Sequence, residues 1–282
     1  HTRFRNVTGV QTCALPICYR EAIALDPDYA PAYNNLGVAL RAQGRLGEAI
    51  DTYRRALRTH ANYPDAHYNL ANALLEQGNA AEAEAHLRTA LASIPDEAGI
   101  RNNLGIALAE QGRPEQALAA MQAAVAIDPT SALARRNLGD ALVASGRTAE
   151  GIAELQRAVA LAPTDAAAHY NLGVALLSVE RLDEAARAFQ QALAITPDSE
   201  AAHNNLGIAL GALGRVDEAE AQFKAALAVN PASADARRNL ELLQGLLRQR
   251  VIVDQARGGH AGPCSVLSRL VVMCLPDEPL HP

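Results

Sequence analysis

Seven asparagines recur along this chain at a spacing of 34 residues, and we refer to them as the ladder asparagines. They are Asn35, Asn69, Asn103, Asn137, Asn171, Asn205 and Asn239. A side-chain amide carries both donors and an acceptor, so it can pair with the N–H and C=O of an extended peptide whatever that peptide's sequence. Each such bond contributes only about 0.5–1.5 kcal/mol net. The pattern therefore predicts binding of a peptide backbone by several repeats together.

A structural role for the ladder asparagines is the alternative. Asn is a mediocre helix former because its side chain competes with the backbone, and seven such residues sum to a few kcal/mol of lost propensity. The residue three positions later varies freely: Val38, Asn72, Ile106, Asp140, Val174 and Ile208. This contrast favours binding. However, the amides could instead bond to the backbone of the next repeat, or be inherited from recent duplication, and the sequence leaves these alternatives open.

The remaining side chains that could do chemistry give weaker signals. One repeat position holds His67, Arg101, Arg135, His169, His203 and Arg237. Histidines one repeat apart are too distant to share a tetrahedral zinc ion, and His260, Cys264 and Cys274 contain no Cys-x-x-Cys pair, so we expect no metal site. The pairs Arg135-Arg136 and Arg237-Arg238 suit either an acidic partner or solvent, and solvation is the simpler interpretation.

Catalytic motifs are missing from the sequence. It contains no glycine-rich phosphate loop, no nucleophile elbow and no paired catalytic carboxylates. The repeated acidic residues Glu48, Glu82, Glu150, Glu184 and Glu218 fall in the first turn of expected helices, where a carboxylate favours the helix dipole. We therefore expect no catalytic residues, no cofactor and no enzymatic activity.

Each repeat is predicted to form two helices that place the asparagine beside an apolar stripe. In the first full repeat, Ala32, Leu36, Ala39 and Leu40 have helical spacing, and Ala49, Tyr53, Ala56 and Leu57 form a second stripe. Gly44 separates the two helices, since glycine readily adopts a positive φ. Glu180 replaces this glycine in the fifth repeat, so that turn is expected to be strained or to use another geometry.

Small residues follow the buried leucine of each first helix. Gly37, Gly105, Gly139, Gly173 and Gly207 stand there, and Ala71 takes the place in the second repeat. Glycine within a helix costs up to about 1 kcal/mol relative to alanine. We infer that a larger side chain would push the two helices of the repeat apart.

The unbroken period fixes the expected organisation. A partial repeat at 19–29 precedes six full repeats at 30–63, 64–97, 98–131, 132–165, 166–199 and 200–233, and a capping helix is expected at 234–250. Residues 1–18, which include Val7 to Ile17, look like a translated sequencing adapter or a disordered terminus. Residues 251–282 are expected to be poorly ordered.

These residues resemble the tetratricopeptide repeat family over roughly residues 19–250, with Leu, Gly or Ala, Ala, a large apolar residue and Pro in phase. The residue pattern of the repeats is similar to that of the repeats of O-linked N-acetylglucosamine transferases. The resemblance implies an all-α, right-handed α-solenoid, or superhelix, that binds a peptide or protein in a concave groove lined by the first helices. It also implies backbone binding by the matching asparagines. The alternative is the substrate-recognition arm of a glycosyltransferase whose catalytic domain is absent from this chain.

Composition sets further limits on partners. The net charge of −6 does not favour nucleic acid, and no run of about 18 apolar residues predicts a membrane span. Cys13, Cys18, Cys264 and Cys274 lie outside the repeats, so the array needs no disulfide. The compartment stays open, with the cytoplasm favoured over the periplasm. The sequence fixes neither the partner nor the oligomeric state.

Overall fold

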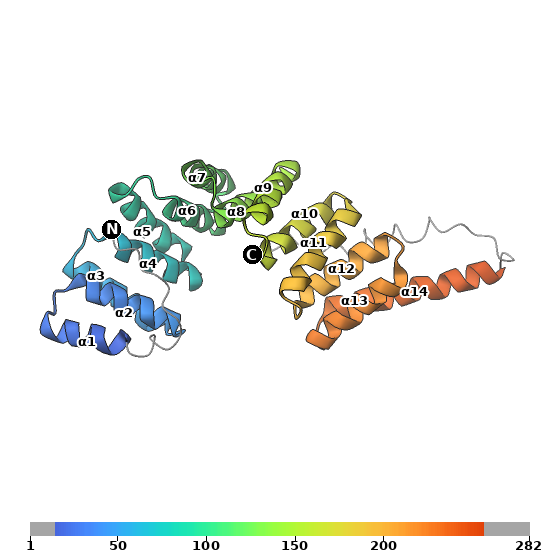
Figure 1. The fold of residues 1–282 in the computed structure, drawn as a ribbon, viewed down its shortest axis with the longest axis horizontal. Helices are drawn as coiled ribbons and strands as arrows, with labels where there is room; N and C mark the ends of the chain where they lie inside the picture. Colours follow the sequence, from blue (N-terminus) through green and yellow to red (C-terminus); the bar gives the residue numbers. More distant parts are fainter. Residues whose placement is uncertain (1–14, 257–282) are drawn as a thin grey trace. The chain divides into compact units, whose positions relative to one another are not determined.

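The protein is an all-α helical repeat solenoid, as the sequence predicts. The structure is a computed structural model that describes residues 15–256, with side chains from 16 to 248. These residues form fourteen helices and no strand (Figure 1): α1 (Leu15–Leu25), α2 (Ala30–Ala42), α3 (Leu46–Thr59), α4 (Pro64–Glu76), α5 (Ala80–Ser93), α6 (Ala98–Glu110), α7 (Pro114–Ile127), α8 (Ala132–Ala144), α9 (Thr148–Leu161), α10 (Ala166–Ser178), α11 (Leu182–Ile195), α12 (Glu200–Ala212), α13 (Val216–Val229) and α14 (Ala234–Ala256).

Every full repeat is one pair of helices. The first helices, α2, α4, α6, α8, α10 and α12, are each 13 residues long, and the second helices, α3, α5, α7, α9, α11 and α13, are each 14 residues long. The two helices of a pair pack on each other, and each first helix also contacts the first helix of the next repeat within the same unit. Within each unit, this stacking brings the first helices of successive repeats together.

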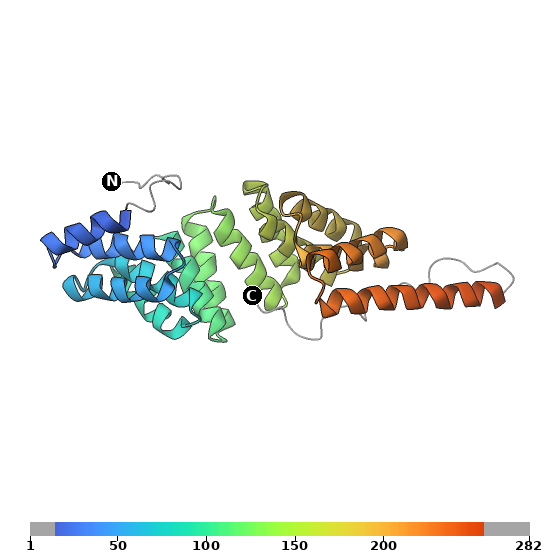
Figure 2. The same cartoon turned by 90° about the horizontal axis from the view of Figure 1, so that it is seen from below.

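The array divides into two compact units, one reaching to Pro129 and one starting at Thr130. The first contains α1 to α7 and the second contains α8 to α14, whose long terminal helix is plain in Figure 2. No insertion, deletion or change in the 34-residue period marks this division in the sequence.

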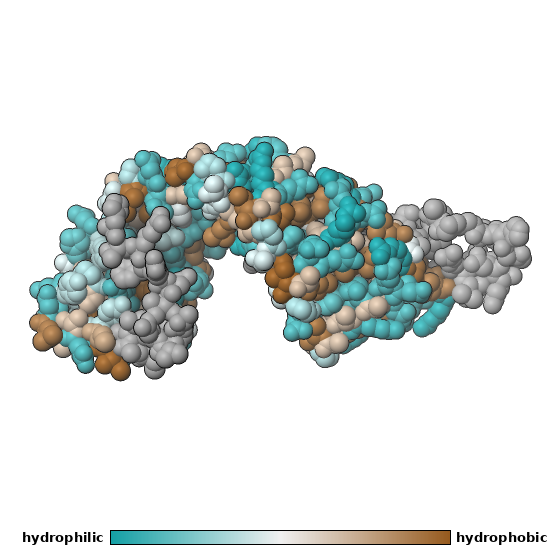
Figure 3. All heavy atoms as spheres, in the orientation of Figure 1, coloured by the Kyte–Doolittle hydropathy of each residue, from teal (hydrophilic) through white to brown (hydrophobic). Residues whose placement is uncertain are grey.

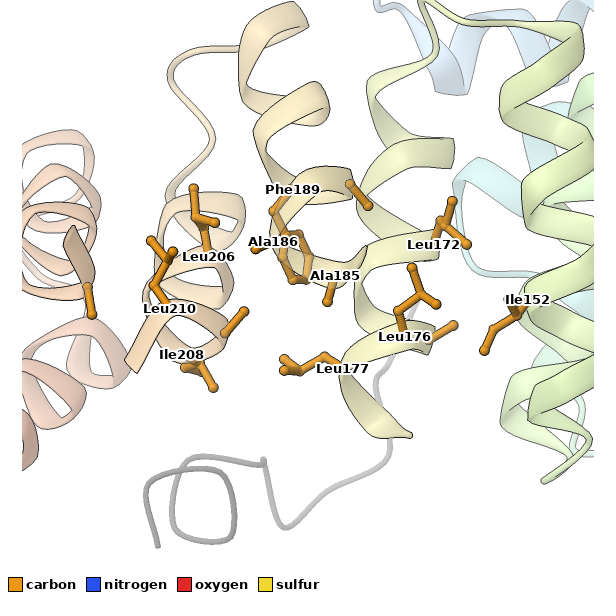
Figure 4. Close-up of a cluster of buried hydrophobic side chains, with 14 of the residues drawn as sticks. Ile152, Leu172, Leu176, Leu177, Ala185, Ala186, Phe189, Leu206, Ile208 and Leu210 are labelled. Carbon is orange, nitrogen blue, oxygen red and sulfur yellow. The ribbon is translucent and has the colours of Figure 1, made fainter. Parts of the chain in front are cut away.

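Each unit has its own apolar core, formed by the predicted stripes. In the first unit, Tyr53, Leu70, Leu74 and Leu87 are fully buried among alanines. In the second, Phe189 lies between α10 and α12, with Leu172, Leu176 and Leu206 around it (Figure 4). Large side chains alternate with alanines, which lets the helices approach closely.

The small residues of the first helices are required by close packing, as predicted. A Cβ atom added at Gly173 would lie 2.6 Å from the Phe189 ring, and one at Gly37 would lie 2.5 Å from the Tyr53 ring. Real Cβ atoms are essentially never that close to another heavy atom. Ala71 is fully buried in the equivalent place of the second repeat, so a methyl group is accommodated there.

The turn between the paired helices keeps one geometry throughout. Gly44, Gly78, Gly112, Gly146 and Gly214 have φ between 70° and 80°, and Glu180 has φ 58°. Of the two outcomes expected at Glu180, the structure shows strain, because a residue with a Cβ atom pays a cost in this left-handed region.

The two ends of the described region differ from the expected boundaries. Helix α1 begins at Leu15, not at 19, because Pro16 occupies the first turn, where its missing N–H leaves no hydrogen bond unmade. Helix α14 runs to Ala256, beyond the expected end at 250, because no Gly or Pro interrupts residues 251–256. The rest of the expected adapter-like segment and of the expected tail, residues 1–14 and 257–282, lies outside the described residues.

Candidate functional site

The ladder asparagines all lie on first helices, one in each of α2, α4, α6, α8, α10, α12 and α14. Asn35 to Asn205 are partly buried, whereas Asn239 is only 1% exposed. Each ladder asparagine is followed by a leucine, which is buried in the apolar stripe except at Leu104 and Leu240, where it is partly buried. Because adjacent residues of a helix point in different directions, the amide is turned away from the centre of the core. This position puts it at the junction between successive first helices.

Five of the ladder amides donate across that junction to the preceding repeat. The Nδ2 atom of Asn69 donates to Asn34 at 2.9 Å, that of Asn103 to Asn72 at 2.6 Å, that of Asn171 to Asp140 at 2.6 Å, that of Asn205 to Tyr170 at 3.1 Å, and that of Asn239 to Asn204 at 2.9 Å. The structural alternative expected bonds to the backbone of the next repeat, whereas these inter-repeat bonds reach side chains of the preceding repeat. We call them the seam bonds.

The acceptor of each seam bond depends on one residue of the preceding repeat, three positions after its ladder asparagine. Where that residue is polar, as at Asn72 and Asp140, it accepts the bond. Where it is apolar, as at Val38, Val174 and Ile208, the acceptor is the residue just before the ladder asparagine, namely Asn34, Tyr170 or Asn204. These acceptors were not anticipated from the sequence. Their signal was the variable position itself, which alternates between polar and apolar residues.

The amide oxygens of the ladder asparagines differ in whether they accept a hydrogen bond. Those of Asn103 and Asn205 accept from the preceding Asn102 and Asn204 at 3.0 and 3.4 Å. No described residue donates to the oxygens of Asn69 and Asn171, and neither oxygen is buried. The oxygen of Asn239 is also without a partner among the described residues, but it is buried. The ladder asparagines Asn69 and Asn171 therefore keep an accessible acceptor oxygen after their seam bonds are made.

The shared histidine and arginine position has a structural task. These side chains donate to a backbone carbonyl six residues earlier: His67 to Ala61 at 2.9 Å, Arg101 to Pro95 at 2.8 Å, His169 to Pro163 at 3.0 Å, His203 to Pro197 at 2.9 Å and Arg237 to Pro231 at 2.7 Å. Each bond satisfies a carbonyl in the loop that follows a second helix. This explains why His and Arg alternate there, since both can donate to a carbonyl.

The consecutive arginines Arg135 and Arg136 both form ion pairs within the second unit. Arg135 pairs with Glu154 at 2.6 Å, and Arg136 pairs with Asp165 at 2.8 Å. Both pairs are at least three-quarters shielded from solvent. These guanidinium groups therefore tie α8 to α9 and to Asp165 at the start of α10, in place of the expected solvated charges.

The described residues provide neither a metal-binding cluster nor a membrane-spanning helix. No group of three or more His, Cys, Asp and Glu side chains among them is arranged to hold a metal ion. None of the described helices combines the length and the apolar character needed to cross a membrane. Hydrophilic side chains cover much of the face in Figure 3, and apolar ones are scattered between them.

The comparisons with known proteins agree with this geometry. Tetratricopeptide repeat family profiles match residues 18–51, 39–78, 68–132, 136–200 and 176–241. No curated protein sequence matches the chain. Among solved structures, the fold is similar to a chain of the APC/C hetero-tetramer Cut9–Hcn1, with TM-score 0.74 and 18% identity over 83% of this chain and 46% of that one. This chain thus spans about half the length of that protein.

Two further solved structures are similar over nearly their whole length. PilF of Pseudomonas aeruginosa has TM-score 0.65 and 22% identity, covering 74% of this chain and 95% of that one. YrrB, described as a TPR protein with an unusual peptide-binding site, has TM-score 0.51 and 26% identity, covering 65% of this chain and 95% of that one. With the helix pairs, the glycine turns and the repeat profiles in agreement, the chain belongs to the tetratricopeptide repeat family.

Proposed function

We propose that this protein is a scaffold for protein–protein interaction and that each unit binds an extended peptide segment along its own first helices, through the ladder asparagines. Membership of the tetratricopeptide repeat family supports the scaffold. The similarity to YrrB, whose description names a peptide-binding site, supports a peptide ligand. The observation that carries the proposal is the pair of accessible amide oxygens on Asn69 and Asn171.

The seam bonds change the expected chemistry of the ladder. Because one N–H of each Nδ2 group on Asn69 and Asn171 is already donating, the amide meets a ligand chiefly through its oxygen, with one N–H left over. The oxygen accepts a backbone N–H of the peptide, and the seam bond fixes the direction in which it points. Preorganisation of this kind lowers the entropy lost on binding. Structural and binding roles are therefore combined in one side chain.

A matched pair of variants tests this proposal. Asn69→Ala and Asn239→Ala each remove a seam bond of 2.9 Å, but only Asn69 has an accessible oxygen. The whole chain is used to select binders from a displayed library of random 12-residue peptides. The affinity of an enriched peptide is then measured for the wild type, for both variants and for Asn171→Ala, together with their melting temperatures.

We expect at least one of the single variants Asn69→Ala and Asn171→Ala to weaken peptide binding about three- to tenfold. This estimate assumes that each lost hydrogen bond costs about 1 kcal/mol of binding free energy. Asn239→Ala should leave the affinity unchanged while lowering the melting temperature. Equal affinities for all the variants would show that the ladder holds repeats together and does not bind ligand. A selection that enriches no peptide would contradict the peptide-binding function itself.

A further inference from the structure

Asp140 is an exception within the ladder. It occupies the variable position three residues after a ladder asparagine, where the other repeats carry Val38, Asn72, Ile106, Val174 and Ile208. Of these six residues, Asp140 alone is ionisable. It lies on α8 at the junction with α10. A single charge in an otherwise neutral row would distinguish this junction from its neighbours.

The surroundings of Asp140 leave its charge without a dedicated partner. Its Oδ2 atom accepts the seam bond from Asn171 on α10 at 2.6 Å. Arg136, one turn earlier on α8, directs its guanidinium at Asp165, with Nη1 at 2.8 and 3.2 Å from the two carboxylate oxygens. No described Arg, Lys or His forms an ion pair with Asp140.

The other charges packed against α8 do not supply the missing cation. On α9, Glu154 takes both Arg135 and Arg157. Burial raises the pKa of Asp140 to about 7, although the Asn171 hydrogen bond and the charge of Arg136 act to lower it, and Asp165 raises it further. The carboxylate is therefore held at the junction with one oxygen committed and its negative charge poorly compensated.

We propose that the junction of α8 and α10 is a subsite for a cationic side chain of the bound peptide, with Asp140 as the specificity-determining carboxylate. This inference rests on the proposed function and gives it a ligand chemistry. Asn171 links the two halves of the contact: its oxygen accepts from the peptide backbone, and its Nδ2 atom orients Asp140. The Oδ1 atom then receives a lysine ammonium or arginine guanidinium group, which supplies the cation that the protein does not.

The test uses a conservative variant and a transplanted charge. Asp140→Asn removes the charge but keeps an acceptor for the seam bond, because Asn72 accepts from Asn103 at the same 2.6 Å. Asn72→Asp places a carboxylate in the equivalent position of the first unit. Whole chains select from the random 12-residue library, with peptides acetylated and amidated in later measurements so that terminal charges play no part. A selected lysine peptide and its norleucine counterpart are then titrated against each chain at pH 8 and pH 5.5.

We expect the wild type to enrich Lys or Arg at one peptide position and to prefer the lysine peptide about tenfold at pH 8. The preference should disappear in Asp140→Asn and shrink at pH 5.5, where Asp140 is protonated. Asn72→Asp should gain a second cationic preference. Enrichment without a basic position, or a preference that persists in Asp140→Asn, would overturn the subsite while leaving the peptide-binding function intact.

A separate measurement decides the subsite if no peptide is enriched and the proposed function fails. The pKa of Asp140 is followed by NMR of its side-chain carboxyl carbon, with and without millimolar N-acetyl-lysine methylamide. A cation at this junction lowers that pKa, and the norleucine analogue does not. An unchanged pKa in both would overturn the proposed subsite.

Discussion

At the scale of single residues, two polar side chains outside the ladder asparagines, Tyr53 and Asp140, lack the partners that such groups usually have. The Tyr53 hydroxyl is fully buried and forms no hydrogen bond with any described residue, and burial raises its pKa to about 12. Asp140 keeps one hydrogen bond but no counter-ion. Because folding removes both groups from water, each lowers the stability of its own repeat.

Removing the hydroxyl of Tyr53 should stabilise the first unit. Tyr53→Phe deletes an unsatisfied donor while keeping the ring that packs on Gly37, and Phe189 shows that phenylalanine suits this repeat position. We expect the free energy of unfolding to rise by about 1 kcal/mol, measured by urea denaturation. The reverse change, Phe189→Tyr, should lower it by at least as much. A loss of stability in Tyr53→Phe would mean that the hydroxyl has a partner after all.

The stability of the second unit should depend on the ionisation of Asp140. Its pKa is about 7 in the folded chain against an ordinary 3.8, so the folded state holds a proton that the unfolded state loses between pH 4 and pH 7. Stability is therefore retained below pH 4 and lost as the pH rises to 7. Asp140→Asn should be more stable than the wild type at pH 8 by roughly 1–3 kcal/mol and equal to it at pH 4.

The control for this pH dependence is Asp198→Asn, which changes an exposed carboxylate of the same unit. Denaturation of the wild type and both variants is followed at pH 4, 6 and 8. A stability difference between Asp140→Asn and the wild type that is the same at all three values would contradict the shifted pKa.

At the scale of helices, the spacing within each pair is set by one small residue facing one large residue. Gly173 and Phe189 make such a contact between α10 and α11, and Gly105 and Met121 make another between α6 and α7. Helix propensity alone would favour alanine at these glycines. Packing wins because overfilling a tight interface costs about 1–3 kcal/mol, which exceeds the propensity gain.

Gly173→Ala should consequently destabilise the second unit by about 1–2 kcal/mol, the packing cost less the gain in helix propensity. The matched control is Gly245→Ala on α14, where an added Cβ atom meets nothing within 4 Å. That change should stabilise the unit by up to about 1 kcal/mol. Thermal and urea denaturation of both variants decide the matter, and variants of equal stability would refute close packing at Gly173.

At the scale of the whole molecule, the described residues form one apolar cluster in each of the two compact units. Repeats of a solenoid contact only their neighbours, so stability is a sum of local terms and unfolding need not be global. The glycosyltransferase-arm alternative also belongs to this scale and stays a prediction. Sequencing the complete reading frame tests it, because that alternative requires a catalytic domain encoded next to the repeats.

Separate cores predict separate unfolding. Leu74→Ala and Leu176→Ala each empty a buried site, at a cost of about 2–5 kcal/mol. We expect Leu74→Ala to accelerate native-state amide exchange in α2–α6 while exchange in α10–α13 stays unchanged. Leu176→Ala should have the opposite effect. Equal acceleration throughout the chain would show that the two units unfold as one.

The sequence by itself determined the helix pairs, the stripes that form the cores, the glycine turns and the family. These features follow from local rules: a strict 34-residue period, helical spacing of apolar residues, and glycine where φ is positive. Apart from the period itself, which needs several copies, they depend on residues close together in one repeat.

Only the tertiary structure decided what the ladder asparagines contact, why His and Arg share one position, and where the array divides into units. The acceptors at Asn34, Asn72, Asp140, Tyr170 and Asn204 belong to a neighbouring repeat, and the choice among them depends on side chains 31 or 35 residues away. A sequence shows which side chains can donate and accept. The packing of one repeat on the next decides which of them meet, and so which amide oxygens stay accessible to a ligand.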